Sequence, residues 1–169
     1  YVNPLEVVQG VSGVEPGLEH ALAARPRWYA CACCPPNVAR LLTSLQEYAV
    51  QESGEDLLVH LYLDGTVDCR KARLTLRTDY PWQGALHWNV SVRESLNFFL
   101  RLPAWANPAE VTLACDGQAL PVCPDHGFLR LPLATGDHEI DLSIPLNPRR
   151  VYARENVCHD AGCVAFACG

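Results

Sequence analysis

The sequence predicts a mostly β fold, in which one helix precedes an antiparallel β-sandwich. Two observations support this prediction. Between residues 36 and 51, apolar residues recur at steps of three and four, which is typical of an amphipathic helix. From residue 56 onwards, apolar and polar residues alternate in short stretches separated by Gly, Pro and Asp turns. Alternation of this kind buries one face of each strand, as in a sandwich of two antiparallel sheets.

The helix follows an irregular segment. Residues 1–27 are interrupted by Asn-Pro and Pro-Gly pairs, which favour a long packed connection. We expect the helix to run from about Pro36 to about Gln51 and to end near Gly54. We also expect its apolar stripe to be core; the stripe comprises Val38, Leu41, Leu42, Leu45, Tyr48 and Ala49.

The predicted strands begin with Leu57–Leu63, which leads into a turn at Asp64 and Gly65. Further alternating stretches lie at residues 74–76, 86–92, 98–102, 111–113, 129–131 and 140–144. A last strand, Gly162–Ala167, reaches the end of the sequence and indicates a truncated domain. The period change therefore separates residues 1–55 from a β-sandwich domain at 56–169.

Composition disfavours several classes of protein. The net charge is −6 and the isoelectric point is about 5.4, which disfavours a nucleic-acid partner. No stretch approaches the roughly 18 consecutive apolar residues of a membrane span. The sequence contains no Met, so we interpret it as a piece of a longer chain. It has nine cysteines, an odd number, which favours free or metal-bound thiols in a reducing compartment, and hence a cytoplasmic protein.

Three cysteines, Cys31, Cys33 and Cys34, fall within four positions. Pro35 and Pro36 follow them, and proline is favoured in the first turn of a helix, so we place the cysteines at a helix N-terminus. Such a position favours a thiolate. Two adjacent thiolates suit Zn(II), but they supply only two of its four ligands. The stretch alone is equally compatible with reduced, buried cysteines.

The remaining cysteines and histidines give weaker indications. Cys158 and Cys163, with His159 beside them, could form a second metal site, although buried or incidental thiols are the more common outcome. We expect the cysteines in or beside strands to act as small apolar residues, and His60 to be a hydrogen-bonded core histidine; these cysteines are Cys69, Cys115 and Cys123.

Several motifs together resemble one known family. They are Tyr-Val-Asn-Pro-Leu-Glu at residues 1–6, Trp-Tyr-Ala-Cys-Ala-Cys-Cys-Pro-Pro-Asn-Val-Ala-Arg at 28–40, Leu-Tyr at 61–62, Asp-Tyr-Pro-Trp at 79–82, Leu-Arg-Leu-Pro-Ala-Trp at 100–105 and Ala-Gly-Cys-Val-Ala at 161–165. The sequence that carries them resembles the β-L-arabinofuranosidases of glycoside hydrolase family 127. It departs from the family pattern at its end, where Cys168-Gly169 replaces the usual Arg-Gly.

The resemblance implies a fold and a site. Residues 1–55 would be the tail of an (α/α)-barrel catalytic domain, and residues 56–169 the following sandwich. The family holds zinc with three cysteines and a glutamate; Cys33 matches the ligand that is also the nucleophile, and Cys34 matches a second ligand. Tyr1 matches a substrate-binding tyrosine, whereas Cys31 matches no ligand. The other two ligands and the glutamate acid/base would lie upstream of Tyr1.

The implied function is retaining hydrolysis of non-reducing terminal β-L-arabinofuranosides through a thioglycosyl intermediate on Cys33. The implied partner is a carbohydrate substrate, and the 169 residues alone should be inactive. Two alternatives stay open: a non-catalytic carbohydrate-binding or structural module with a structural zinc, and a related glycosidase that acts on another sugar. No sequence feature indicates an oligomeric state.

Overall fold

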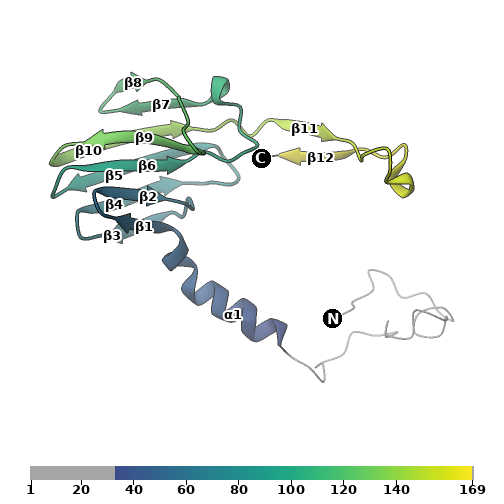
Figure 1. Ribbon diagram of the computed structural model, residues 1–169, viewed down its shortest axis with the longest axis horizontal. Helices are drawn as coiled ribbons and strands as arrows, with labels where there is room; N and C mark the ends of the chain where they lie inside the picture. The colour runs from purple at the N-terminus through teal and green to yellow at the C-terminus, as the bar shows by residue number, and fades with distance from the viewer. Residues whose placement is uncertain (1–32, 169) are drawn as a thin grey trace. The chain divides into compact units, whose positions relative to one another are not determined.

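The computed structural model describes residues 33–168. The chain divides between Ser44 and Leu45 into two units, which we describe separately. The described part of the first unit is helix α1, Cys34–Ser44. The second unit opens with a 3₁₀ turn at Leu45–Tyr48 and continues through twelve strands (Figure 1): β1 Val50–Ser53, β2 Asp56–Val59, β3 Gly65–Asp68, β4 Ala72–Thr78, β5 Ala85–Val92, β6 Leu96–Arg101, β7 Thr112–Cys115, β8 Gln118–Leu120, β9 Phe128–Leu133, β10 Gly136–Ser143, β11 Pro148–Val151 and β12 Ala165–Cys168.

Helix α1 is shorter than its apolar periodicity predicts. The hydroxyls of Thr43 and Ser44 donate to carbonyls one turn back, a pattern that competes with regular helix propagation. The predicted end at Gln51 is wrong, because Val50 and Gln51 already belong to β1. There Val50 pairs with Val59, and the carbonyl of Ala49 accepts the N–H of His60 at 2.8 Å. Pairing in the sheet therefore overrides the helical pattern over the last residues.

The prediction that the whole apolar stripe is core is also wrong. Val38, Leu41, Leu42 and Tyr48 are each more than half exposed, whereas Ala49 is buried. Periodicity identifies the apolar face of a helix, but it does not supply a surface that covers this face.

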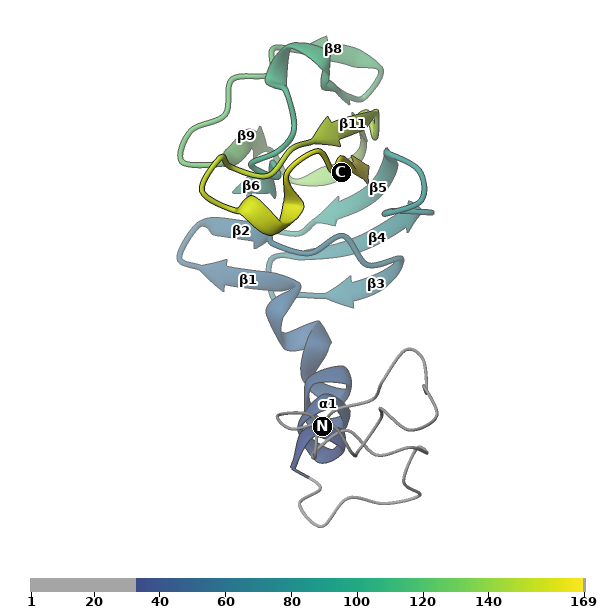
Figure 2. The same ribbon diagram turned by 90° about the vertical axis from the view of Figure 1, so that its right-hand side faces the viewer.

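The strands form two sheets and a separate hairpin. The four-stranded sheet has the order β1-β2-β6-β9, the six-stranded sheet has the order β3-β4-β5-β10-β7-β8, and β11 pairs with β12. Figure 2 shows β1, β2, β6 and β9 in one layer and β3, β4 and β5 in the other. The described pairs are antiparallel except for β2 and β6, which are parallel with Leu57 opposite Phe98. The predicted antiparallel sandwich is thus confirmed with one parallel pair inside it.

The core lies between the two sheets, and Trp88 is at its centre. This residue of β5 makes edge-on contacts with Tyr62 and with Phe98 of β6, with ring centroids 5.5 and 6.5 Å apart respectively. Tyr62 is buried, and its hydroxyl donates to the carbonyl of Arg101. Edge-on aromatic pairs of this kind stabilise a core beyond the area they bury. Because Trp88 and Phe98 come from different sheets, they join the two layers.

Strand β10 is central to the six-stranded sheet. It pairs with β5 on one side, placing Asp141 opposite His87, and with β7 on the other, placing Ile140 opposite Cys115. Just beyond these ladders Gly84 lies so close to Ile144 that a Cβ atom on Gly84 would fall 1.8 Å from the Ile144 carbonyl oxygen. The tight turn at Asp116 and Gly117, both with positive φ, connects β7 to β8.

Four of the short strands have no counterpart among the predicted strands. Strands β1, β3, β8 and β11 have only three or four residues each, too few to show a clear alternation. In the four-stranded sheet β9 is an edge strand and carries Pro132 opposite Asn97. Within residues 33–168, no helix has both the length and the hydropathy that crossing a membrane requires.

Candidate functional site

The adjacent cysteines lie where the sequence places them, at the start of α1. Cys33 immediately precedes the helix, and its carbonyl accepts the N–H of Asn37 at 3.2 Å, the first bond of the helical ladder. Cys34 is the first residue of the helix. Cys33 therefore occupies the N-cap position, and the predicted location of both cysteines at a helix N-terminus is confirmed.

The geometry of the two thiols suits a shared ligand. The sulfur atoms of Cys33 and Cys34 are 3.8 Å apart, and both residues are exposed. Two sulfurs that bind one tetrahedral Zn(II) at 2.3 Å each are separated by about 3.8 Å. The separation thus fits two corners of a tetrahedral zinc site.

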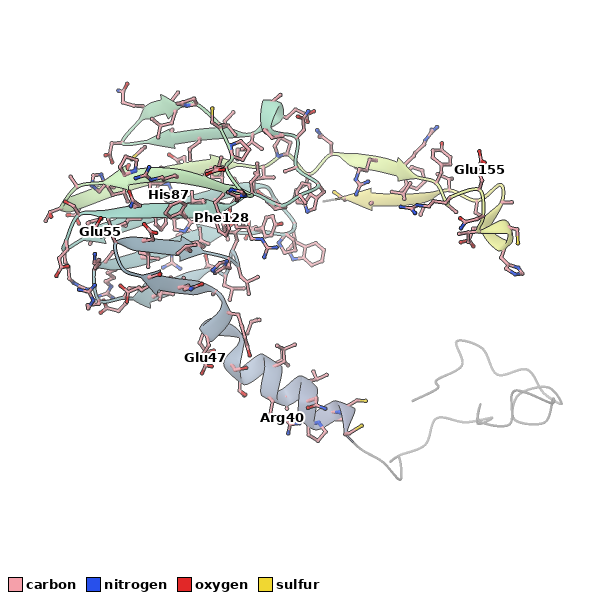
Figure 3. The ribbon with its side chains drawn as sticks, viewed as in Figure 1. Arg40, Glu47, Glu55, His87, Phe128 and Glu155 are labelled. Carbon is pink, nitrogen blue, oxygen red and sulfur yellow. The ribbon has the colours of Figure 1, made fainter. Side chains whose placement is uncertain are left out.

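The two prolines change the electrostatics of this helix end. A helix leaves its first four N–H groups without intrahelical partners, and these groups make its N-terminus attractive to anions. Pro35 and Pro36 have no N–H, so two of the four donors are missing here. One turn further along, the guanidinium of Arg40 donates a hydrogen bond to the Asn37 side chain. Figure 3 shows Arg40 on α1. Backbone donors are therefore a weak source of thiolate stabilisation, and a bound cation would be a stronger one.

The other predicted site residues are distributed differently. Tyr1 and Cys31 lie outside the described residues. His60 is half-buried, accepts or donates one hydrogen bond with Gln51 at 3.1 Å, and contacts Phe128 edge-on, in line with the structural role expected for it. Cys158 and Cys163 are exposed, so of the two outcomes expected for them, buried or incidental thiols, the buried one is wrong.

One cluster was missed by sequence reasoning. Within residues 33–168, a single group of three side chains has metal-ligating atoms close together, all within 4.8 Å of one another: Cys115, Asp116 and His138. Cys115 was expected to act only as a small apolar residue. The signal was present in the sequence as a Cys-Asp pair before a turn and a histidine at the start of a later strand, but only the β7–β10 register brings them together.

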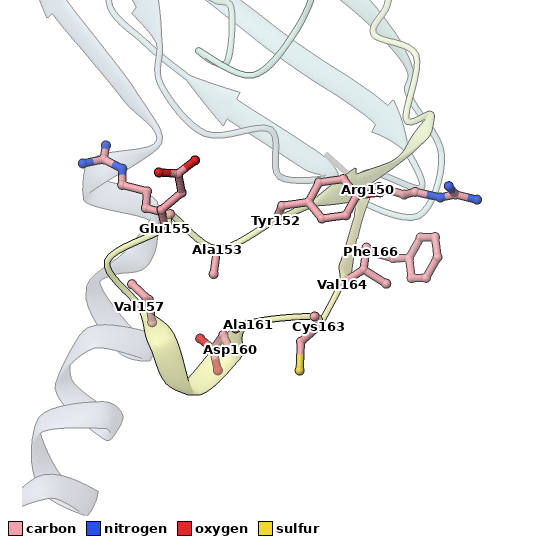
Figure 4. A pocket seen from close by; sticks show the side chains of 12 residues that line it. Arg150, Tyr152, Ala153, Glu155, Val157, Asp160, Ala161, Cys163, Val164 and Phe166 are labelled. Carbon is pink, nitrogen blue, oxygen red and sulfur yellow. The ribbon is translucent and has the colours of Figure 1, made fainter.

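A hollow of about 600 Å³ lies beside the β11–β12 hairpin (Figure 4). Its lining includes the exposed aromatic rings of Tyr152 and Phe166, with Asp160 and Cys163 in the connecting segment. Its charged side chains come from Arg150, Arg154, Glu155 and Asp160. The sequence patterns gave no indication of this hollow.

Comparison with known proteins identifies the sandwich. A family model described as β-L-arabinofuranosidase, GH127 middle domain, matches residues 56–146. These residues contain β2 to β10 and the core between the sheets. The sandwich thus corresponds to a middle domain found in glycoside hydrolases. The chain belongs to the GH127 β-L-arabinofuranosidase family.

Relatives agree over a larger part of the chain. A curated non-reducing end β-L-arabinofuranosidase of Bifidobacterium longum subsp. longum is 34% identical over 180 residues, which cover 100% of this chain and 27% of that protein. The crystal structure of a GH127 β-L-arabinofuranosidase from Geobacillus stearothermophilus T6 matches with 30% identity and a TM-score of 0.80, covering 100% of this chain and 28% of that one. A second GH127 β-arabinofuranosidase structure matches with 25% identity and a TM-score of 0.76, over 86% of this chain and 26% of that one. The chain therefore spans little more than a quarter of the relatives it matches.

Proposed function

We propose that this chain forms part of a retaining β-L-arabinofuranosidase in which Cys33 is the nucleophile. Membership of the GH127 family and the names of the relatives support this class of reaction and a non-reducing terminal β-L-arabinofuranoside as substrate. The single observation that carries the residue assignment is the position of the two adjacent thiols, 3.8 Å apart at the start of α1.

We further propose that Cys33 and Cys34 hold a zinc ion together with ligands outside this chain. The separation of the sulfurs supports this, and so does the shortage of backbone donors at the helix start. When bound, zinc would keep the thiols deprotonated near neutral pH, since a free cysteine has a pKa of about 8.5. The two prolines would hold the start of the helix, and with it the positions of both sulfurs.

The hydrolysis proposed for Cys33 takes two steps. Its thiolate attacks the anomeric carbon, so that a carbon–sulfur bond forms while the glycosidic bond breaks and the leaving oxygen takes a proton from a general acid. A water molecule, deprotonated by the same group, then attacks the anomeric carbon and releases the thiolate. Each step inverts the configuration, so the product retains it. The acid/base carboxyl would come from outside the described residues.

The decisive experiment replaces the nucleophile in the full-length protein that carries this chain. Cys33→Ser should lower kcat on an aryl β-L-arabinofuranoside by at least about a thousandfold, as expected when a nucleophile is lost. Denatured, briefly reacted wild-type protein should carry one pentosyl group on the peptide that contains Cys33. Cys123→Ser, at an exposed thiol in the sandwich, is the control and should leave kcat unchanged.

The same measurements separate the alternatives. A structural zinc module predicts that Cys33→Ser and Cys34→Ser reduce zinc content and thermal stability, with no pentosyl adduct and no hydrolysis in the wild type. A related glycosidase predicts an adduct of a different sugar. Near wild-type turnover by Cys33→Ser would refute the nucleophile assignment.

A further inference from the structure

We propose that Cys115, Asp116 and His138 form a second site for a divalent metal ion of zinc type, independent of the cysteines on α1. The ligand atoms come from the end of β7, the turn that follows it, and the start of β10. They represent three kinds of ligand that zinc binds in proteins, namely a thiolate, a carboxylate and an imidazole.

The imidazole of His138 is oriented as a ligand. Its Nε2 is 3.0 Å from the carbonyl oxygen of Ala134, to which it donates, and its Nδ1 is 2.8 Å from Oδ2 of Asp116. Metal-binding histidines ordinarily donate their other ring N–H to a carbonyl or carboxylate, which fixes the ring and its tautomer. Ala134 supplies this support, so the Nδ1 atom of His138 points at the carboxylate.

Asp116 and Cys115 are also held in place. The N–H of Glu139 donates to Oδ1 of Asp116 at 2.9 Å, and the N–H of Asp116 donates to the Glu139 carbonyl at 2.8 Å. The thiol of Cys115 lies 3.7 Å from Oδ2 of Asp116, and Cys115 is paired with Ile140 in the β7–β10 ladder. Three ligands on paired strands and a tight turn form a site that is largely organised before an ion binds.

Two protons, one on Cys115 and one on His138, lie where a metal ion would bind. Both the thiol of Cys115 and Nδ1–H of His138 donate to the same oxygen, Oδ2 of Asp116. Loss of these two protons would leave a thiolate, a carboxylate and a neutral imidazole, with a combined charge of −2 that balances a divalent cation. Nearby Asp137 adds further negative potential at His138.

Two of the three separations between ligand atoms require only a small adjustment, and the third, between sulfur and nitrogen, is within 4.8 Å. In a tetrahedral zinc site the imidazole nitrogen and carboxylate oxygen are about 3.3 Å apart, and the sulfur and oxygen about 3.5 Å. The observed values are 2.8 and 3.7 Å, so the exposed carboxylate of Asp116 must shift by about half an ångström. Asp116 is half exposed, which leaves a route for the ion and a position for water as fourth ligand.

The test uses the 169-residue chain with Cys31, Cys33 and Cys34 all replaced by Ser, so that no ion is held at α1. Titration with Co²⁺ should produce a thiolate-to-metal charge-transfer band, which Zn²⁺ should abolish by displacement. At pH 6, binding should release about two protons per ion. Adding Cys115→Ser should remove the band, and adding His138→Gln or Asp116→Asn should weaken binding by at least about tenfold.

Two matched controls test specificity. His87 and Asp141 form a similar pair, 2.7 Å apart across β5 and β10, and His87→Gln should leave Co²⁺ affinity unchanged. Cys123→Ser should leave the band unchanged. In the triple-Ser chain that keeps Cys115, Asp116 and His138, Zn²⁺ should shift the NMR resonances of the His138 ring and leave those of His87 in place. This measurement locates the bound ion even if a ligand variant unfolds. Absence of Co²⁺ binding, a band that survives Cys115→Ser, or shifts at His87 alone would overturn the proposal.

Discussion

At the scale of single residues, His138 shows how three weak indications combine into one local structure. Both of its ring nitrogens donate in the metal-free protein, to Asp116 and to Ala134, so the doubly protonated ring is the form that fits its surroundings. The Asp116 carboxylate raises the pKa of His138 above its ordinary value, and the His138 donor lowers the pKa of Asp116. The charged pair therefore ties the start of β10 to the β7–β8 turn.

This pair predicts a pH-dependent contribution to stability. A raised pKa in the folded state means that the His138 contribution is complete below the unfolded pKa of about 6.5 and is lost as pH rises through the folded value. The lowered pKa of Asp116 means that its contribution is lost as pH falls through that value. In EDTA, the difference in unfolding free energy between wild type and His138→Gln should be at most about 1 kcal/mol near pH 6, and should shrink in both directions.

Urea unfolding of both proteins between pH 3 and 9 measures this difference. The control is His87→Gln, whose ion pair is more exposed and should give a smaller change across the same range. A difference between wild type and His138→Gln that stays flat with pH would show that the ion pair contributes nothing.

At the scale of elements, the sequence predicted well wherever a strand was long enough to alternate. Strands β4, β5, β6, β9 and β10 each have six or more residues, and their buried faces follow the apolar positions in the sequence. Strands β1, β3, β8 and β11, of three or four residues, were missed because so few positions do not define a period. The end of α1 was misplaced for another reason, since the pairing of Val50 with Val59 depends on a strand that comes later in the chain.

Gly84, just before β5, should not tolerate a larger residue. At Gly84 an added Cβ would lie 1.8 Å from the Ile144 carbonyl oxygen, so the backbone would have to move. Gly84→Ala should lower the free energy of unfolding by more than about 2 kcal/mol. Gly127→Ala is the matched control, because Gly127 has φ of +82° and open space around it. Its cost should be about 1 kcal/mol, from backbone strain alone.

Thermal and urea unfolding of the two glycine variants separate a collision from strain. Equal destabilisation by both variants would contradict the close approach of Gly84 to Ile144.

At the scale of the whole molecule, alternation predicted the two-layer sandwich but not the order of its strands. The parallel pairing of β2 with β6 joins segments that are separated by three strands of the other sheet, and no local pattern encodes it. The candidate site divides in the same way. Cys33 and Cys34 were found because they are adjacent in the sequence, whereas the cluster around His138 needed the fold to assemble it. The zinc ion, the role of Tyr1 and a cytoplasmic location stay predictions.

The packing between the layers predicts a contrast between two neighbouring phenylalanines. Phe98 is fully buried between the sheets, while Phe99 lies on the other face of β6 and contacts Phe128. Phe98→Ala should lower the unfolding free energy by about 3–5 kcal/mol, because it leaves a cavity against Trp88. Phe99→Ala should cost less than half as much. Denaturant unfolding of both variants measures the contrast, and comparable losses would argue against a core between these two layers.

The proline on β9 also matters beyond its own domain. An edge strand presents a row of backbone groups on which a strand from another molecule can dock, and this is how many β proteins begin to aggregate. Pro132 offers no N–H to such an incoming strand, and its ring obstructs a continuous ladder. At high protein concentration, pairing of two copies of this sandwich along β9 is therefore disfavoured, and so is the growth of fibrils through this edge.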